Sequence, residues 1–266
     1  MLGLIISIAC VNAADLNGTD DLGSNFNESQ KDCTLASDSH NSYYVDSNEG
    51  DDSNSGMSWN SSLKSFNKAL DLAQDNDDIY LSNGVYSDLE NTKITIDKSV
   101  NLIGSSNTTF DGLYTNYIFI ISDNNNVTFK NINFINAYKI QRDYDLIEDY
   151  ELEGVYGSAL DIKNAKVTLE NCSFIYNMAN YEANVYEFVY GGAISNFGDL
   201  TILNSYFYGN AVGATMDIMG YGGSIYNKGK LYLNNSRFAD SRVNTYSYGG
   251  AIYNDGDMLI NNSVIA

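Results

Sequence analysis

Hydrophobic and polar residues alternate in short runs through the second half of the chain. In one such run, Leu200 and Ile202 fall on one face while Thr201 and Leu203 fall on the other. A period of two predicts a β-strand, because successive side chains of a strand point to opposite sides. Gly198 supplies a turn just before this strand, and no helical period separates it from the next such run. The pattern therefore indicates a chain built from short strands.

This strand belongs to a repeat with three clear copies. The copies begin at Gly191, Gly222 and Gly249 and read Gly-Gly-Ala/Ser-Ile-x-Asn-x-Gly, then alternating apolar residues, then Asn-Ser-x-Phe/Ile. Each copy spans the same length, since 207 − 191, 238 − 222 and 265 − 249 are all 16, whereas successive copies start 31 and 27 residues apart. A constant core joined by links of variable length predicts stacked repeats whose insertions emerge at one corner.

A coil of parallel strands fits this repeat better than a meander of hairpins. In a parallel stack each residue lies ~4.8 Å from its equivalent in the next rung, a rung being one turn of the coil. Identical residues gain from such stacking, whereas antiparallel neighbours would not make them equivalent. We therefore predict an all-β solenoid. Its links, 138–156, 175–190, 208–221 and 239–248, should form one continuous surface that faces partners.

Asparagine recurs at one position of the repeat, directly before a change in the alternation that indicates a bend at Ser205. We expect these side chains to face inward and to pass amide hydrogen bonds from rung to rung. Each would satisfy polar groups whose burial otherwise costs ~1–3 kcal/mol. Their predicted role is structural. The members of this ladder are Asn131, Asn171, Asn204, Asn235 and Asn262.

The motif Gly-Gly-Ala-Ile-x-Asn-x-Gly-x-Leu-x-Ile-x-Asn-Ser-x-Phe resembles the repeat of the polymorphic outer-membrane proteins of chlamydiae. It also resembles the adhesin-like surface proteins of methanogenic archaea. The resemblance is specific over residues 157–266 and looser over residues 43–137. It implies a single-stranded right-handed parallel β-helix of the pectin-lyase-like type. It also implies a surface location and an adhesive role, and it does not imply an enzyme.

The N-terminal part divides into segments of different character. Residues 1–14 contain a short apolar run followed by a small-residue cleavage site, which predicts a secretory signal peptide. A lipoprotein anchored through Cys10 is a weaker alternative, because Ser7 lies where an aliphatic residue is expected. Residues 15–41 are polar and acidic and predict a disordered lead-in. Residues 42–266 are the predicted β-helix domain.

Both ends of the predicted domain have distinctive features. Residues 62–76 carry apolar side chains at helical spacing, including Leu63, Phe66 and Leu70, and Ser61 or Ser62 can cap the helix. Such a helix would cover the strand edge and core of the first rung. At the other end, the chain stops after the apolar residue that closes a rung. We therefore expect it to be part of a longer array.

Charge and residue usage exclude several functions. The 266-residue chain has 34 acidic and 14 basic residues and a formal net charge of −20, which disfavours binding to nucleic acid or a polyanionic substrate. The single histidine, His40, lies in the lead-in, so a Ser-His-Asp site is excluded. A Cys33–Cys172 disulfide is conceivable but is not needed by the fold. No transmembrane segment is predicted beyond the signal peptide.

One acidic loop could bind a metal. Carboxylate and amide oxygens are the ligands that Ca²⁺ prefers, but the spacing departs from the helix–loop–helix calcium pattern. A solvated acidic loop explains the same residues, and no other cofactor is expected. The candidate ligands are Asp46, Asn48, Asp51 and Asp52.

Tyrosine recurs directly before the glycine that starts each rung, and a second, shorter set lies inside the repeat. Aromatic rings amid asparagine and aspartate suit a surface that binds a neutral sugar or a protein. The rings could also cover the flank of the coil and stack on one another. The first set is Tyr156, Tyr190, Tyr221 and Tyr248, and the second is Tyr226 and Tyr253.

Three functions remain open. The first is a secreted cell-surface protein, adhesin-like and non-catalytic, that binds an extracellular glycan or a cell-surface protein at the link corner. The second is a polysaccharide lyase or glycoside hydrolase, in which the acidic residues of 143–153 would supply the two carboxyls, ~5–9 Å apart, that glycoside cleavage needs. None of the three arginines lies in a lyase-like motif. The third is a passive stalk.

Overall fold

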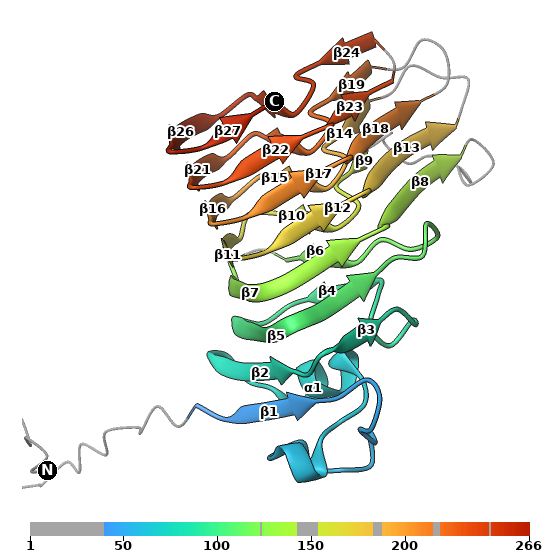
Figure 1. Cartoon of the computed structure of the whole chain (residues 1–266), viewed down its shortest axis with the longest axis vertical. Helices are drawn as coiled ribbons and strands as arrows, with labels where there is room; N and C mark the ends of the chain where they lie inside the picture. The colour runs from blue at the N-terminus through green and yellow to red at the C-terminus, as the bar shows by residue number, and fades with distance from the viewer. Residues whose placement is uncertain (1–39, 123, 143–153, 183–187, 215–218, 245) are drawn as a thin grey trace, which may run out of the picture. The chain divides into compact units, whose positions relative to one another are not determined.

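The computed structural model describes residues 40–122, 124–142, 154–182, 188–214, 219–244 and 246–266 (Figure 1). The predicted signal peptide, Cys10, Cys33, most of the lead-in and the acidic segment 143–153 lie outside these residues. Within the described ranges, no helix has the length and apolar character needed to cross a bilayer.

The chain winds into a right-handed parallel β-helix, which confirms the predicted fold class (Figure 1). Strands of successive rungs pair in parallel and in register. Leu200, for example, lies between Val167 and Leu231. One rung runs through β10 (Leu160–Ile162), β11 (Lys166–Glu170), β12 (Ser173–Ile175), β13 (Met178–Glu182) and β14 (Phe188–Tyr190), and β15 (Ile194–Asn196) begins the next.

Two sheets form the wall of the coil. The wide sheet takes two strands from most rungs, one on each side of a bend. Its members are β1 (Ser42–Val45), β2 (Asp77–Leu81), β3 (Gly84–Tyr86), β5 (Val100–Asp111), β7 (Asn126–Ile135), β11, β12, β16 (Asp199–Leu203), β17 (Tyr206–Tyr208), β21 (Lys230–Asn234), β22 (Arg237–Ala239), β26 (Asp257–Asn261) and β27 (Val264–Ile265). The second sheet contains β4 (Ile94–Ile96), β6 (Phe119–Ile121), β10, β15, β20 (Ile225–Asn227) and β25 (Ile252–Asn254).

The alternation of the sequence correctly predicts which side chains lie in the core. Leu200 and Ile202 of β16 are buried, whereas Thr201 and Leu203 are partly exposed. Phenylalanines then stack along the axis, with ring centroids 4.7 Å apart between Phe174 and Phe207 and 4.3 Å apart between Phe207 and Phe238. The predicted gain from placing like residues above one another is realised in this interior column.

The described parts of the variable links consist largely of strands. They form two further sheets, here called the side lobe, which stand beside the coil (Figure 1). Buried Val155, Ala179, Tyr181, Val189 and Val212 form a small core between these sheets. The outgoing sheet contains β8 (Tyr138–Arg142), β13, β18 (Ala211–Ala214) and β23 (Arg242–Val243), and the return sheet contains β9 (Val155–Tyr156), β14, β19 (Met219–Tyr221) and β24 (Tyr246–Tyr248).

A short helix closes the N-terminal side of the core. The helix α1 (Phe66–Leu72) is shorter than the predicted 62–76, because Leu63 pairs with Val45 in an isolated β-bridge instead. A single 3-10 turn, η1 (Trp59–Ser61), precedes it. The Oγ of Ser65 accepts a hydrogen bond from the backbone N–H of Lys68 and so caps the helix. Phe66 packs against Phe110 and Phe119 at 5.9 and 5.1 Å, so the helix covers the core as predicted.

The paired glycines of the repeat have separate physical roles. Gly191 and Gly222 have φ of +67° and +69°, a backbone conformation that glycine adopts at little cost. At the next position, a Cβ on Gly192 would collide with the carbonyl oxygen of Gly223. The glycine pair therefore lets the return strand turn sharply onto the second sheet.

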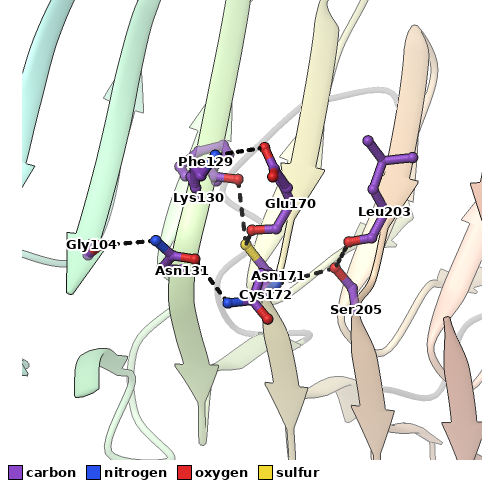
Figure 2. A network of polar contacts seen from close by, with 9 residues as sticks. All are labelled: Gly104, Phe129, Lys130, Asn131, Glu170, Asn171, Cys172, Leu203 and Ser205. Carbon is purple, nitrogen blue, oxygen red and sulfur yellow. Dashed lines mark hydrogen bonds and ion pairs between the residues drawn. The ribbon is translucent and has the colours of Figure 1, made fainter. Parts of the chain in front are cut away.

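The predicted inward asparagine ladder is wrong in its orientation. Asn131, Asn171, Asn204, Asn235 and Asn262 all have positive φ, between 44° and 57°. Four of these side chains are exposed and Asn131 is half-buried, so they lie outside the bend. Some still bond between rungs, since Asn171 donates to Asn131 at 2.8 Å (Figure 2). The left-handed residue changes which side the next residue faces, and the following residue points inward instead.

The residue that follows each of these asparagines points inward and forms a ladder inside the coil. The backbone N–H of Cys172 donates to the Oγ of Ser205 at 3.1 Å (Figure 2). On the next rung, the N–H of Ser205 donates to the Oγ of Ser236 at 3.0 Å. A second interior ladder joins Asn196 to Asn227 through their side-chain amides. The predicted principle of a polar ladder therefore holds, but other columns of the repeat carry it.

Candidate functional site

Tyrosines line the outer face of the return sheet. Val189 of β14 points into the side-lobe core, so its neighbour Tyr190 points outward. Tyr156, Tyr190, Tyr221 and Tyr248 occupy one register position and stack as predicted. Their ring centroids are 5.1, 5.4 and 5.2 Å apart, with interplanar angles of 10°, 17° and 10°. The rings cover one another's faces, so this column presents mainly edges and hydroxyl groups.

The second tyrosine set lies beside this column on the second sheet. Tyr226 and Tyr253 stack at 5.8 Å with an angle of only 3°. The two columns meet, since Tyr190 lies 4.5 Å from Tyr226 and Tyr221 lies 4.8 Å from Tyr253. We call these six residues, Tyr156, Tyr190, Tyr221, Tyr248, Tyr226 and Tyr253, the tyrosine corner. The structure brings every predicted tyrosine into it.

Burial raises the pKa of three phenols in the corner, those of Tyr190, Tyr221 and Tyr226. Burial raises the pKa of Tyr226 to about 12, and the negative charge of Asp255 adds to this. Burial also raises the pKa of Tyr190 and Tyr221, with smaller contributions from neighbouring tyrosines. These groups are therefore hydrogen-bond donors at neutral pH and cannot serve as bases.

Exposed apolar side chains border the tyrosine corner. Phe188, Met219 and Tyr246 share the register position two residues before the tyrosine column, on the same outer face of the return sheet. Tyr246 is 67% exposed and Tyr248 is 50% exposed. A surface that gathers tyrosine, phenylalanine and methionine has the composition of the central part of a binding interface.

A buried ion pair lies below the tyrosine corner and was not predicted. Asp161 occupies the register position that Ser195 and Tyr226 hold in later rungs. Its side chain is 2% exposed and accepts bonds from Lys139 at 2.9 Å and from Lys163 at 3.1 Å. The hydroxyl of Ser195 donates to its other oxygen at 2.8 Å. Burial alone would raise the pKa of Asp161, but the two lysines and Ser195 outweigh this and hold the pKa below its usual value.

This cluster closes the base of the side lobe. Lys139 lies at the register position of Ala179, which is a core residue of the lobe. Its ammonium reaches Asp161, while Lys163 lies 4.9 Å from the centre of the Tyr156 ring. Both carboxylate oxygens of Asp161 are engaged, so the group is not poised for acid–base chemistry. An alignment of the links would have shown Lys139 as a charged residue at an otherwise apolar position, which Ala179, Val212 and Val243 hold in later rungs.

The predicted calcium ligands mainly organise their own loop. Asp46 accepts bonds from the backbone N–H of Asn48, and Asp51 accepts one from Ser53. Asp52 accepts bonds from the N–H groups of Lys64 and Ser65 before the helix. Across the described ranges, no group of three or more histidine, cysteine, aspartate or glutamate side chains could hold a metal ion. The structure therefore does not bring these four residues together as a cluster.

Residues 48–224 match the sequence profile of a family described as "Protein of unknown function (DUF1565)". No curated protein sequence matches the chain. One similar solved structure is titled "Rhamnogalacturonan lyase"; it is 12% identical, with a TM-score of 0.47 over 85% of this chain and 62% of that chain. The chain thus spans less than two thirds of that protein, and the likeness carries no inference about activity.

Proposed function

The chain belongs to the DUF1565 family, whose function is unknown, and we propose that it is a secreted, cell-surface, adhesin-like protein that binds its partner without catalysis. The partner is a glycan or protein on another surface. The tyrosine corner with its exposed border carries this proposal.

The geometry of the corner supports binding. Two stacked columns hold the rings in place, so little side-chain entropy is lost when a partner docks. Neutral phenol groups donate hydrogen bonds, while Phe188 and Met219 supply apolar area beside them. Tyrosine-rich surfaces of this kind serve as adaptable recognition sites, because each ring combines an apolar body with a polar tip.

The secreted location and the adhesive role rest on the sequence. They are supported by the signal-peptide pattern of residues 1–14 and by the resemblance of the Gly-Gly repeat to surface-protein repeats. The non-catalytic reading is supported by Asp161, a carboxylate that Lys163 links to Tyr156 of the corner, because its two oxygens are both bonded.

A binding and activity experiment tests the proposal. The full chain is applied to a glycan array and to cells that display surface proteins. The variant Phe188→Ser/Met219→Ser/Tyr246→Ser removes the exposed border of the corner. The control Tyr114→Ser removes an exposed tyrosine that lies at a turn after β5. We expect the triple variant to lose at least tenfold in binding, which corresponds to ~1.4 kcal/mol.

Two results would overturn the proposal. The first is equal binding by the triple variant and the control. The second is release of unsaturated or reducing ends from a polysaccharide by the full chain, which would make it a carbohydrate-active enzyme.

A further inference from the structure

We infer a second binding site, for a neutral oligosaccharide, in a groove outside the bend of the wide sheet. The groove has a volume of about 450 Å³ and crosses the rungs of β7, β11–β12 and β16–β17. Asn131, Asn171 and Asn204 line it at the bend, and Asn133, Ser173 and Tyr206 line it beyond the bend. It lies on a different sheet from the tyrosine corner and goes beyond the proposed function.

The groove is electrically neutral. None of its lining residues is charged, although the chain has a formal net charge of −20. Lys130 and Glu170, which precede Asn131 and Asn171 in the sequence, form an ion pair at 3.1 Å and so compensate each other. A groove without a net charge has no group to hold a uronate or a phosphate. It suits a ligand that is polar but uncharged.

The bend holds its amides in a fixed orientation. Asn131 and Asn171 have φ of 57° and 54°, and Asn171 donates to Asn131 at 2.8 Å (Figure 2). On the next pair of rungs, Asn235 donates to Asn204 at 2.7 Å. An amide offers two N–H donors and an oxygen with two lone pairs, so one rung-to-rung bond leaves capacity on both sides. The amides are thus positioned in advance to bond hydroxyl groups of a ligand.

Beyond the bend, a tyrosine supplies an aromatic surface. Tyr206 is 37% exposed and lies near Tyr208, with centroids 6.1 Å apart and an angle of 14°. Its equivalents on the adjacent rungs are Ser173 and Arg237, so its face is not covered by a ring at the same register position, as the faces in the tyrosine corner are. Ser173 instead donates to Asn133 at 2.6 Å. A ring beside fixed amides matches a sugar, which has a C–H face and hydroxyl edges.

Calorimetric titration of the full chain tests the inference. The probes are neutral hexasaccharides, one of glucose units and one of mannose units, and a hexamer of galacturonate as the charged comparison. Tyr206→Ala removes the ring. Asn171→Gly/Asn204→Gly removes two amides and keeps the positive φ without strain, so this variant should fold. Tyr114→Ala, which removes an exposed ring at the turn after β5, is the matched control, and Tyr246→Ala, in the exposed border of the tyrosine corner, reports binding at that other site.

We expect at least one neutral hexasaccharide to bind, and Tyr206→Ala to weaken it about three- to tenfold. The double variant Asn171→Gly/Asn204→Gly should weaken binding in the same direction, and Tyr114→Ala should leave it unchanged. The inference is overturned if no neutral probe binds, if the galacturonate hexamer binds equally well, or if only Tyr246→Ala weakens binding. The variants of the tyrosine corner test a different site, so a result that rules out binding in the groove does not contradict the proposed function.

Discussion

The side-chain amide of Asn196 donates a hydrogen bond of 2.6 Å to the side-chain oxygen of Asn227 on the next rung, and both side chains are fully buried. Asn227 donates in turn to Asn254, also at 2.6 Å. It also bonds the backbone oxygens of Gly229 and Asp257, each at 3.2 Å. This column therefore satisfies both its own amides and the turns that follow the second sheet.

Replacing a residue of this interior ladder should destabilise the coil. We expect Asn227→Leu to lower the free energy of unfolding by about 2–4 kcal/mol, because buried amide and carbonyl groups lose their partners. Asn204→Gly, at an exposed position with positive φ, should change it by less than about 0.5 kcal/mol. Urea denaturation measures both. Equal losses in the two variants would show that the interior column has no special role.

Acid should weaken the fold through Asp161. The pKa of this carboxyl is lower in the folded chain than the ~3.9 of an unfolded one. Between those two values the unfolded chain binds more protons, so stability rises with pH. The contribution is fully present above the unfolded pKa and is lost as the pH falls through the folded one.

Asp161→Asn tests this pH dependence. At neutral pH it should destabilise the fold by about 2–4 kcal/mol, somewhat less than for a fully buried pair because both lysines remain partly exposed. It should also flatten the fall in stability on acidification. Asp199→Asn, which removes an exposed partner of Lys230 at 3.6 Å, is the control and should have little effect. Urea denaturation from neutral to acid pH measures the stability of each protein. Denaturation midpoints that fall equally in the parent protein and in both variants would contradict this role of Asp161.

Alkali should act through Tyr226. Its pKa is raised to about 12, whereas an unfolded tyrosine titrates near ~10. Above the pKa of an unfolded tyrosine, the unfolded chain loses a proton that the folded chain keeps. The stability contribution is thus complete below the unfolded pKa and disappears as the pH rises through the folded one.

Phenolate absorbance follows that titration directly. We expect several phenols to titrate late, among them Tyr190 and Tyr221, and Tyr226→Phe to reduce this late component by one phenol. Tyr246→Phe removes an exposed phenol and should leave the late component at its full size. A late component of unchanged size in Tyr226→Phe would show that the pKa of Tyr226 is not raised.

Cys172 should be unreactive until the chain unfolds. It is free and buried, and burial raises its pKa to about 12, so the thiolate that alkylating agents need is scarce. Peptide mass spectrometry after iodoacetamide treatment distinguishes it from Cys10 and Cys33. Rapid labelling of Cys172 in the native protein would show that the rung opens readily.

The same position tests the serine ladder. Cys172→Ser should change stability by less than about 1 kcal/mol, because the hydroxyl can take the role that Ser205 and Ser236 have. Cys172→Val removes the Sγ–H group that donates to the carbonyl oxygens of Phe129 and Glu170 and should cost about 1–3 kcal/mol. Similar stabilities of the two variants in urea would mean that this column contributes packing alone.

The repeat carried enough information to predict the coil, because a constant spacing places equivalent residues above one another. The stacking of Tyr190 on Tyr221 followed from the same register. The direction of Asn204 did not, because alternation stops at a residue with positive φ and does not say which side it faces. In the structure Leu203 is partly exposed, Asn204 is exposed and Ser205 is buried, so the asparagine faces outward.

The side lobe was harder to predict for a different reason. Its strands are short, and their lengths differ between copies, so no period marks them. Lys139 belongs to β8 of the side lobe, and Asp161 belongs to β10 of the second sheet, so their pairing depends on how the side lobe packs beside the coil. These two strands meet only in the folded protein. The spacing of the charged residues in the sequence therefore does not predict the contact.

The side lobe also has an evolutionary consequence. One outgoing strand and its return strand make an arm, and an arm buries its apolar face largely together with the arms of adjacent rungs, as Ala179 does between Lys139 and Val212. A single arm on an otherwise tightly turned coil would leave that face in water. Insertions at this corner should therefore be gained and lost in contiguous runs of rungs, with a charged residue such as Lys139 marking where a run begins.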